Sequence, residues 1–220
     1  MKQTSSTIIG LCAALISSSC LIPSNAIHTT FSKQPSPISN KYIISGGPCV
    51  GKTSLITYFA SRGLQTVPEA YASLFEEARV QGALGNFFAD PIKLREQLIA
   101  KQQKLENNCI PTKFTLLDRS MVDIIFYADY FNTILPATLI EQASKTAYNQ
   151  YVFFLEPLPE ELYMMNDRRG EDRAEALKMH HALKQWYQRY GYTIIDVPFD
   201  TIEHRALLIL NLVHRFEHAQ

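Results

Sequence analysis

The chain carries no excess of either charge, because its 21 Lys and Arg residues balance its 21 Asp and Glu residues. Without net charge it offers nucleic acid or an anionic membrane surface no overall electrostatic attraction, so we expect no nucleic-acid partner. Any anion must bind at a local cluster of side chains or backbone groups. With 220 residues, 46% of them hydrophobic, the chain is suited to one folded domain with an ordinary core.

Cysteine is also scarce. The four cysteines, Cys12, Cys20, Cys49 and Cys109, form neither a C-x-x-C pair nor the spacing of a zinc site. A disulfide at Cys49 would obstruct the glycine-rich loop described below. We therefore predict a domain of a reducing compartment, in which the cysteines are small apolar fillers.

The N-terminal region contains no apolar run long enough to cross a bilayer. Residues 1–26 nevertheless resemble a secretory signal, because Lys2 precedes an apolar run over residues 8–16 and small residues stand at Ser24 and Ala26. An unstructured extension and a mistaken start are the alternatives. Residues 27–40, with several Pro, Ser and Thr, are predicted to be a flexible linker that contributes nothing to thermal stability.

Residues 46–53 form a complete G-x-x-x-x-G-K-S/T motif, GGPCVGKT, between an apolar run at 42–45 and a helix-forming run. Strand, glycine-rich loop and helix are the context of a phosphate-binding P-loop, in which backbone N–H groups and the helix N-terminus face the phosphates. Lys52 is expected to reach the β- and γ-phosphates, and the Thr53 hydroxyl to ligate Mg²⁺. The predicted nucleotide-binding residues are Gly46, Gly47, Pro48, Cys49, Val50, Gly51, Lys52, Thr53 and Ser54.

Short apolar runs alternate with helix-length segments through the rest of the chain. Strands are predicted at 42–45, 64–68, 113–118, 151–155 and 192–197, and helices at 54–62, 70–81, 90–107, 121–131, 136–148, 177–190 and 202–216. This alternation predicts βαβ units with right-handed crossovers. The expected fold is an α/β P-loop NTPase three-layer sandwich with a five-stranded parallel sheet. Its ligands should lie beyond the carboxyl ends of the strands, where Gly46, Glu69 and Asp118 fall.

The chain resembles the AAA-type P-loop family related to the nicotinamide riboside kinase domain of NadR proteins. The resemblance rests on the ordered stretches KYIISGGPCVGKTSLITYFASRGLQTVPEAY, FTLLDRSMVDIIFYADY, YVFFLEPL, DRRGEDRAEALKMHHALKQWYQRYGYTIIDVP and EHRALLIL. It covers nearly all of residues 41–216 and implies a P-loop kinase-like domain over 41–218, with ATP and Mg²⁺ as cofactors. Cys49 departs from the pattern, since the family usually has a small residue such as glycine there.

Asp118 ends the apolar run at 113–117, where a carboxylate can hold Mg²⁺ directly or through water. By resemblance to nucleoside kinases with an Asp-Arg-Ser sequence here, Arg119 would face the transferred phosphate or pair with the catalytic carboxylate. The alternative is a helix N-cap Asp beside a surface Arg. AAA+ motors carry Asp-Glu at this place, so the Asp-Arg pair argues against a motor.

Glu69 follows the second predicted strand, beside the expected place of an acceptor hydroxyl in a P-loop kinase. A carboxylate there would accept the hydroxyl proton or orient the attack, although phosphoryl transfer depends mostly on positioning and charge stabilisation. The alternative is an acid in the first turn of a helix, favoured by the helix dipole.

Arg168, Arg169 and Arg173 lie in a polar crossing segment over residues 162–173. Closure of this segment over the phosphates would place cations on transition-state charge. The alternative is a solvated charged face. Gln102, Gln103 and Arg95 are expected to face the acceptor pocket, whereas His180, His181 and the aromatic stripe Trp186, Tyr187 and Tyr190 are interpreted as packing.

Two functions remain open at this point. The first is a small-molecule kinase that uses ATP and Mg²⁺ and has a nucleoside or riboside as acceptor. The second is a nucleotide-binding module or slow hydrolase that recruits a protein or lipid partner. An N/T-K-x-D guanine motif is absent after the fourth strand, which disfavours a GTPase switch. A nucleotide user is expected in a nucleotide-containing cytosol, and export into another cell's cytosol would reconcile this with the signal-like segment.

Overall fold

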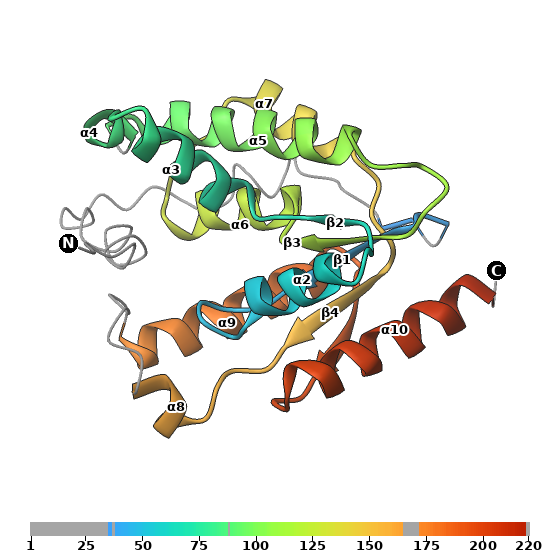
Figure 1. Cartoon of the computed structure of the whole chain (residues 1–220). Coiled ribbons are helices and arrows are strands. Elements are labelled where there is room, and N and C mark those ends of the chain that lie inside the picture. The colour runs from blue at the N-terminus through green and yellow to red at the C-terminus, as the bar shows by residue number, and fades with distance from the viewer. Residues whose placement is uncertain (1–34, 37, 88, 165–171, 219–220) are drawn as a thin grey trace.

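The computed structural model describes residues 35–36, 38–87, 89–164 and 172–218 (Figure 1). Within them, five parallel strands form one sheet in the order β2-β3-β1-β4-β5. The strands are β1 (Lys41–Ser45), β2 (Thr66–Val67), β3 (Thr115–Asp118), β4 (Tyr151–Leu155) and β5 (Thr193–Val197). β1 pairs with β3 and β4, with Ile44 opposite Asp118 on one side and Phe153 on the other. The loop after β1 therefore leaves from the middle of the sheet.

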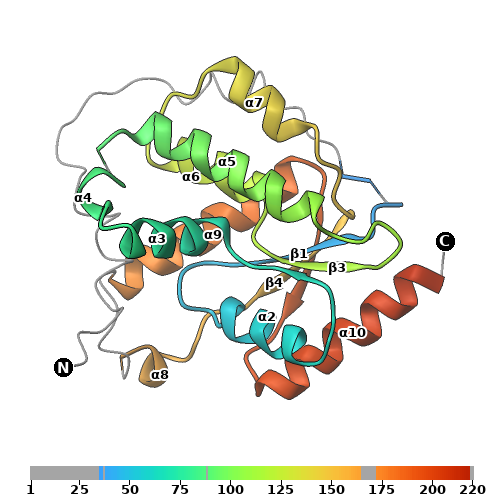
Figure 2. The same ribbon diagram turned by 45° about the horizontal axis from the view of Figure 1, so that its top comes forward.

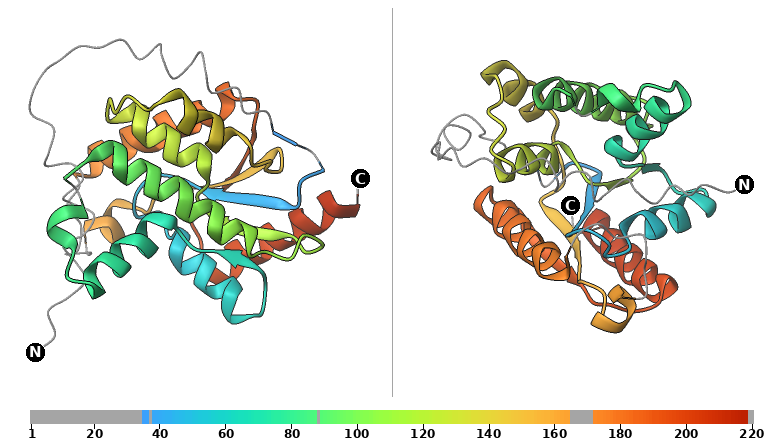
Figure 3. Two further views of the ribbon diagram at one scale, coloured as in Figure 1. Left: turned by 90° about the horizontal axis from the view of Figure 1, so that it is seen from above. Right: turned by 90° about the vertical axis from the view of Figure 1, so that its left-hand side faces the viewer.

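Helices cover both faces of the sheet, which confirms the predicted three-layer α/β sandwich (Figures 2 and 3). One face carries α2 (Lys52–Ser61) and α10 (Ile202–His218) side by side. The other carries α3 (Ala70–Val80), α5 (Pro91–Asn107), α6 (Met121–Tyr130), α7 (Ala137–Ser144) and α9 (Arg173–Arg189). Neighbouring residues of β1 enter opposite cores, because successive strand side chains alternate between faces.

Most predicted boundaries agree with the structure. Helix α5 begins as expected at Pro91, and the Asp90 carboxylate accepts from the Ile92 and Lys93 N–H groups at 2.9 and 3.0 Å. Helix α7 ends at Ser144, before the predicted limit of 148. The reason is Tyr148, whose side chain turns into the core and donates its hydroxyl to Glu106 at 2.7 Å.

Two short helices were not predicted. Helix α4 (Leu84–Phe87) follows the glycine turn after α3, and α8 (Glu160–Met164) occupies the start of the segment that the sequence suggested to be a polar crossing. The predicted polar crossing segment thus begins in a short helix, in which Tyr163 is buried. A buried tyrosine contributes apolar contact area that the polar composition of the segment does not indicate.

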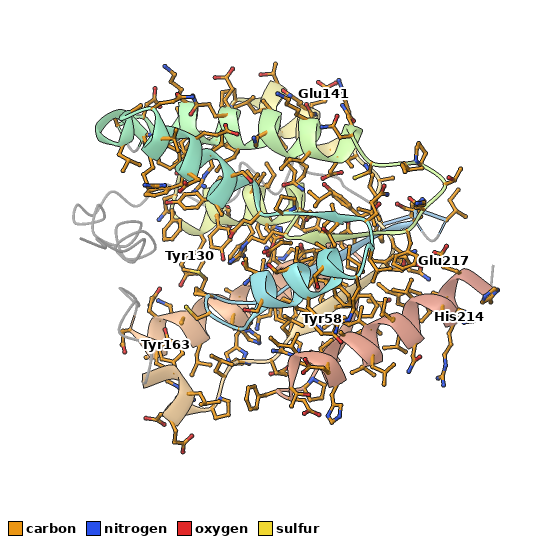
Figure 4. The ribbon with its side chains drawn as sticks, in the orientation of Figure 1. Tyr58, Tyr130, Glu141, Tyr163, His214 and Glu217 are labelled. Carbon is orange, nitrogen blue, oxygen red and sulfur yellow. The ribbon has the colours of Figure 1, made fainter. Side chains whose placement is uncertain are left out.

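Contacts between distant segments fasten the outer helices. Tyr130 on α6, labelled in Figure 4, donates its hydroxyl to Glu175 on α9 at 2.6 Å. Tyr42 on β1 donates to Glu217 near the end of α10, also at 2.6 Å. These bonds join α9 to α6 and α10 to the sheet, and both α9 and α10 contribute residues to the site described below. Among the described residues, no helix combines the length and apolar character needed to cross a membrane.

The last residues of the predicted linker contact the domain. The Asn40 side-chain amide donates to the carbonyls of Pro111 and Lys113, and the Asn149 amide donates to the Ser39 carbonyl at 2.7 Å. The Ser36 N–H donates to the Tyr148 carbonyl at 2.8 Å. These bonds join the segment before β1 to the loops at the amino ends of β3 and β4.

We expect removal of residues 1–40 to lower the melting temperature relative to removal of residues 1–35. Each hydrogen bond contributes roughly 0.5–1.5 kcal/mol, so loss of the four bonds named above should cost the shorter protein about 2–6 kcal/mol and several degrees or more. Thermal denaturation of the two truncated proteins, followed by circular dichroism, measures the difference. Equal melting temperatures would mean that residues 36–40 behave as the flexible linker that their composition predicts.

Candidate active site

The loop between β1 and α2 has the backbone conformation that its glycines permit. Gly46 and Gly51 have φ angles of 139° and 91°, which disfavour other residues. Cys49 has φ 59°, and a side chain in this left-handed region costs roughly 1–2 kcal/mol. This strain gives a physical reason for glycine at the position where the sequence departs from the family pattern.

Lys52 lies folded back on its own loop. Its ammonium donates to the carbonyls of Gly46 at 3.1 Å and Gly47 at 2.7 Å, and the side chain is buried. Burial, with a further contribution from the nearby Arg119 charge, lowers the pKa of Lys52 to about 8. An anion that replaced the loop carbonyls as the partner of this ammonium would gain a nearly desolvated cation.

Thr53 and Asp118 meet across the gap between α2 and β3. The Thr53 hydroxyl donates to Asp118 Oδ2 at 2.9 Å, and burial together with the Glu69 charge raises the pKa of Asp118 to about 6. Asp118 Oδ1 is buried and has no hydrogen-bond partner among the described residues. A hydroxyl and a carboxylate with an unused oxygen are the hard oxygen ligands that Mg²⁺ prefers, so these two residues fit the predicted metal role.

Arg119 and Glu69 form an ion pair with 2.7 Å between Nε and Oε1. The Arg119 backbone has φ 68°. Its side chain is only 13% exposed and donates from Nη1 to the Tyr127 hydroxyl at 2.8 Å. Its surroundings of Glu69, Asp123 and Tyr127 hold the pKa of the guanidinium above its ordinary value despite the burial, which lowers it. The pair therefore fixes a permanent cation beside a carboxylate.

The alternative interpretation of Asp118 and Arg119 is wrong. Ser120, not Asp118, caps helix α6, in a capping box completed by Asp123, and Arg119 is not a surface residue. Glu69 stands at the N-terminus of α3, as its own alternative predicts, and its side chain makes no hydrogen bond to that helix but pairs with Arg119. Ser120 and Asp123 take over the capping, which leaves Asp118 free to face Thr53.

One cavity of about 410 Å³ is lined by the P-loop residues 48–54 and by the Glu69–Arg119 pair. The rest of its lining includes Tyr71, Arg95, Leu98, Gln102, Ile124, Tyr127, Phe131 and Met179. Arg95 and Gln102, expected to face an acceptor pocket, thus line the same cavity as the P-loop, whereas the Gln103 side chain pairs with Gln142 outside the cavity lining.

A family model described as an AAA domain matches residues 41–205. The chain belongs to this AAA domain family. The resemblance inferred from the ordered motifs is thereby confirmed. No curated protein matches the chain.

Solved structures similar to this AAA domain include the NadR protein in complex with NR, with TM-score 0.56 and 18% identity. That match covers 81% of this chain and 51% of NadR, so the chain spans about half the length of that protein. Thymidylate kinase from Candida albicans is similar with TM-score 0.53 and 14% identity, over 83% of this chain and 94% of the kinase. Thymidylate kinase from Ehrlichia chaffeensis gives 0.51 and 15%, over 79% and 97%. These likenesses show a P-loop kinase-like fold.

The three arginines predicted to close over the phosphates are only partly described in this AAA domain. Arg168 and Arg169 lie outside the described residues. Arg173 begins α9, where its Nη1 lies 3.6 Å from Glu160 Oε2, and it lines a small hollow shared with Pro48 and Val50. Residues of α8, α9 and the P-loop therefore lie next to one another around this hollow.

Two residues at the P-loop were missed by the sequence interpretation. His180 on α9, assigned to packing, is buried and accepts a hydrogen bond at Nδ1 from the Gly47 N–H at 3.2 Å. Burial lowers the pKa of His180 to about 4, so the ring is neutral and able to accept. Arg205 on α10 donates to the Val50 carbonyl at 2.9 Å. Neither lies at a diagnostic spacing from the motif, because 133 and 155 residues separate the partners.

The pKa values of Asp118 and Lys52 predict a bell-shaped pH dependence for Mg–ATP binding. Asp118 must lose its proton to hold the metal, so affinity should rise as pH increases through about 6. Lys52 must keep its proton to hold phosphate, so affinity should fall above about 8. Each limb should change affinity by about tenfold per pH unit, as expected for one proton.

Calorimetric titration of the protein with Mg–ATP between pH 5 and 9 measures this profile. In Lys52→Arg the upper limb should disappear, since a guanidinium does not titrate in this range, and in Asp118→Asn the lower limb should disappear. If the wild-type profile were flat, or if both variants kept both limbs, these two groups would not control nucleotide binding.

Proposed function

We propose that this AAA domain is an ATP- and Mg²⁺-dependent kinase that transfers the γ-phosphate to a hydroxyl of a nucleoside- or riboside-like molecule. The carrying observation is that the cavity at the P-loop is also lined by the Glu69–Arg119 pair and by side chains of α3, α5, α6 and α9. Its volume of about 410 Å³ lies in the range of small-molecule pockets. Hydrolysis alone needs only the P-loop side of such a cavity, whereas transfer to a second molecule needs room for an acceptor as well.

The Glu69–Arg119 ion pair lines this cavity together with the P-loop. Glu69, with a side chain 25% exposed, lies where its free carboxylate oxygen would accept a hydrogen bond from an acceptor hydroxyl and direct it toward the γ-phosphate. Arg119, held by Glu69 and Tyr127, would place its charge on the transferred group. Bound Mg²⁺ at Thr53 and Asp118 would supply further neutralisation of phosphate charge.

The part of the cavity lining that lies outside the P-loop supports a nucleoside-like acceptor. Leu98, Ile124 and Phe131 provide apolar surface on which a planar heterocycle can pack. The Gln102 side chain, buried and oriented by a 2.9 Å bond to Glu106, offers an amide to such a ring. An apolar slot with a few fixed polar groups is the usual design of a pocket that selects a small aromatic ligand.

A panel of nucleosides, ribosides and simple sugars, incubated with the protein, Mg²⁺ and γ-labelled ATP, tests the proposal. We expect label to appear in at least one nucleoside or riboside product and not in ribose, which cannot fill the apolar part of the cavity. If the protein binds ATP but labels no member of the panel, the alternative of a nucleotide-binding module or slow hydrolase with a protein or lipid partner replaces the kinase.

A further inference from the structure

Arg205 is a buried cation behind the P-loop. It lies in the first turn of α10, is 5% exposed, and makes one hydrogen bond, from Nη1 to the Val50 carbonyl at 2.9 Å. Its Nε and Nη2 groups have no hydrogen-bond partner among the described residues. Arg205 lines neither the large cavity nor the hollow under α8 and α9, so it meets the loop from the side away from the ligand.

The charge of Arg205 is not balanced by a contact with a carboxylate. Among the described residues, no Asp or Glu oxygen lies within ion-pair distance of the guanidinium. Asp200 and Glu156 act on it only through longer-range attraction, and burial lowers its pKa. Burying an uncompensated cation costs several kcal/mol of stability, so a positive charge at this place is not explained by packing.

The geometry of one peptide links Arg205 to the ligand side of the loop. Because a trans peptide is planar, the Val50 carbonyl and the Gly51 N–H point in opposite directions. Arg205 holds the carbonyl from behind the loop, so the N–H of the same peptide is directed to the other side, where Val50 and Gly51 line the cavity. A cation on the carbonyl oxygen also polarises the peptide and strengthens its N–H as a donor.

We infer that Arg205 is a positioning residue that fixes the Val50–Gly51 peptide for phosphate binding, and that the bound polyphosphate compensates its buried charge. The inference rests on the proposed use of a nucleotide at the P-loop, but not on transfer to an acceptor. The φ of 91° favours glycine at position 51, and a Cβ there would lie 3.3 Å from Arg205 Nη1, so the guanidinium would have to shift by a few tenths of an ångström. The loop and α10 thus act as one phosphate-binding unit.

This role predicts opposite effects on stability and on affinity. In Arg205→Met, which keeps the length of the side chain and removes the charge, the melting temperature of the nucleotide-free protein should stay the same or rise. Affinity for Mg–ATP and for inorganic tripolyphosphate should fall by about tenfold for both ligands, as expected for loss of an oriented, charge-assisted donor. Arg205→Lys retains a cation and should restore most of the affinity.

Calorimetry with the full chain and no acceptor measures these changes, with Arg215→Met as the control, since Arg215 is exposed on the same helix. Unchanged tripolyphosphate affinity in Arg205→Met would overturn the inference. If ATP affinity alone fell, Arg205 would act on the nucleoside part of ATP and not on its phosphates. A loss in Arg205→Met accompanied by a clear fall in melting temperature, and not restored by Lys, would mean a merely structural role. If the wild-type protein bound tripolyphosphate but transferred no phosphate to any acceptor, the proposed kinase activity would be contradicted and the role of Arg205 would not.

Discussion

Lys52→Ala is expected to weaken Mg–ATP binding by a factor on the order of a hundred or more while the fold stays intact. The Lys52 ammonium donates to two carbonyls of its own loop, at 2.7 and 3.1 Å, and phosphate oxygens would replace these carbonyls as its acceptors. Hydrogen bonds to charged groups contribute about 1.5–3 kcal/mol each, and two such bonds lost correspond to at least a hundredfold in affinity.

The fold should tolerate the change, because a buried cation near Arg119 is removed together with its desolvation cost. Isothermal titration and thermal denaturation of the purified variant give both quantities. Lys145→Ala is the matched control, since Lys145, the C-cap of α7, is 70% exposed and pairs with Glu141 one turn earlier. ATP affinity that is equal in wild type and Lys52→Ala would remove the basis for a phosphate site at this loop.

Glu69→Gln is expected to slow phosphoryl transfer by a factor on the order of a hundred or more and to leave ATP affinity nearly unchanged. The substitution keeps the shape of the side chain and removes the charge that orients the acceptor hydroxyl. A fall in rate of about a hundredfold is the usual effect of losing a general base. The bond of Lys52 to the Gly47 carbonyl and the bond of Thr53 to Asp118 do not involve Glu69, so the nucleotide should still bind.

The control for this variant is Glu76→Gln, on the same helix α3, where the carboxylate is 57% exposed and pairs with Arg79. Initial rates with any accepted nucleoside, measured beside ATP binding, separate the two effects. An unaffected transfer rate in Glu69→Gln would exclude Glu69 as the carboxylate that orients the acceptor. Equal losses of rate and ATP affinity would instead mean that the Glu69–Arg119 pair supports the phosphate site itself.

Local sequence signals predicted the sheet and the phosphate loop. The apolar runs of β1, β3 and β4 are buried on both faces, so they appear in the sequence as continuous hydrophobic segments between helix-length stretches. The start of α5 could be predicted because Asp90 and Pro91 act within one helical turn. The strand order then placed Glu69 and Arg119 at the same edge of the sheet, where they form an ion pair.

Long-range contacts could not be predicted in the same way. His180 and Arg205 reach the loop from helices more than a hundred residues away, and no periodicity distinguishes them from the packing residues beside them. Helix α7 ends before Tyr148, whose hydroxyl donates to the buried Glu106 carboxylate on α5. The polar segment after β4 begins with helix α8, in which Tyr163 is buried. In each case one side chain found a distant partner whose position depends on the assembled fold.

Gly47 also constrains how relatives of this protein can diverge. A Cβ at Gly47 would lie 2.8 Å from the His180 Cβ and 3.2 Å from the Ala176 carbonyl, so any larger residue must push α9 outward. Such a shift would also move Arg173, the first residue of α9. Substitution at position 47 should therefore be accompanied by compensating changes along α9 during evolution, and the phosphate loop and this helix should diversify as a covarying pair.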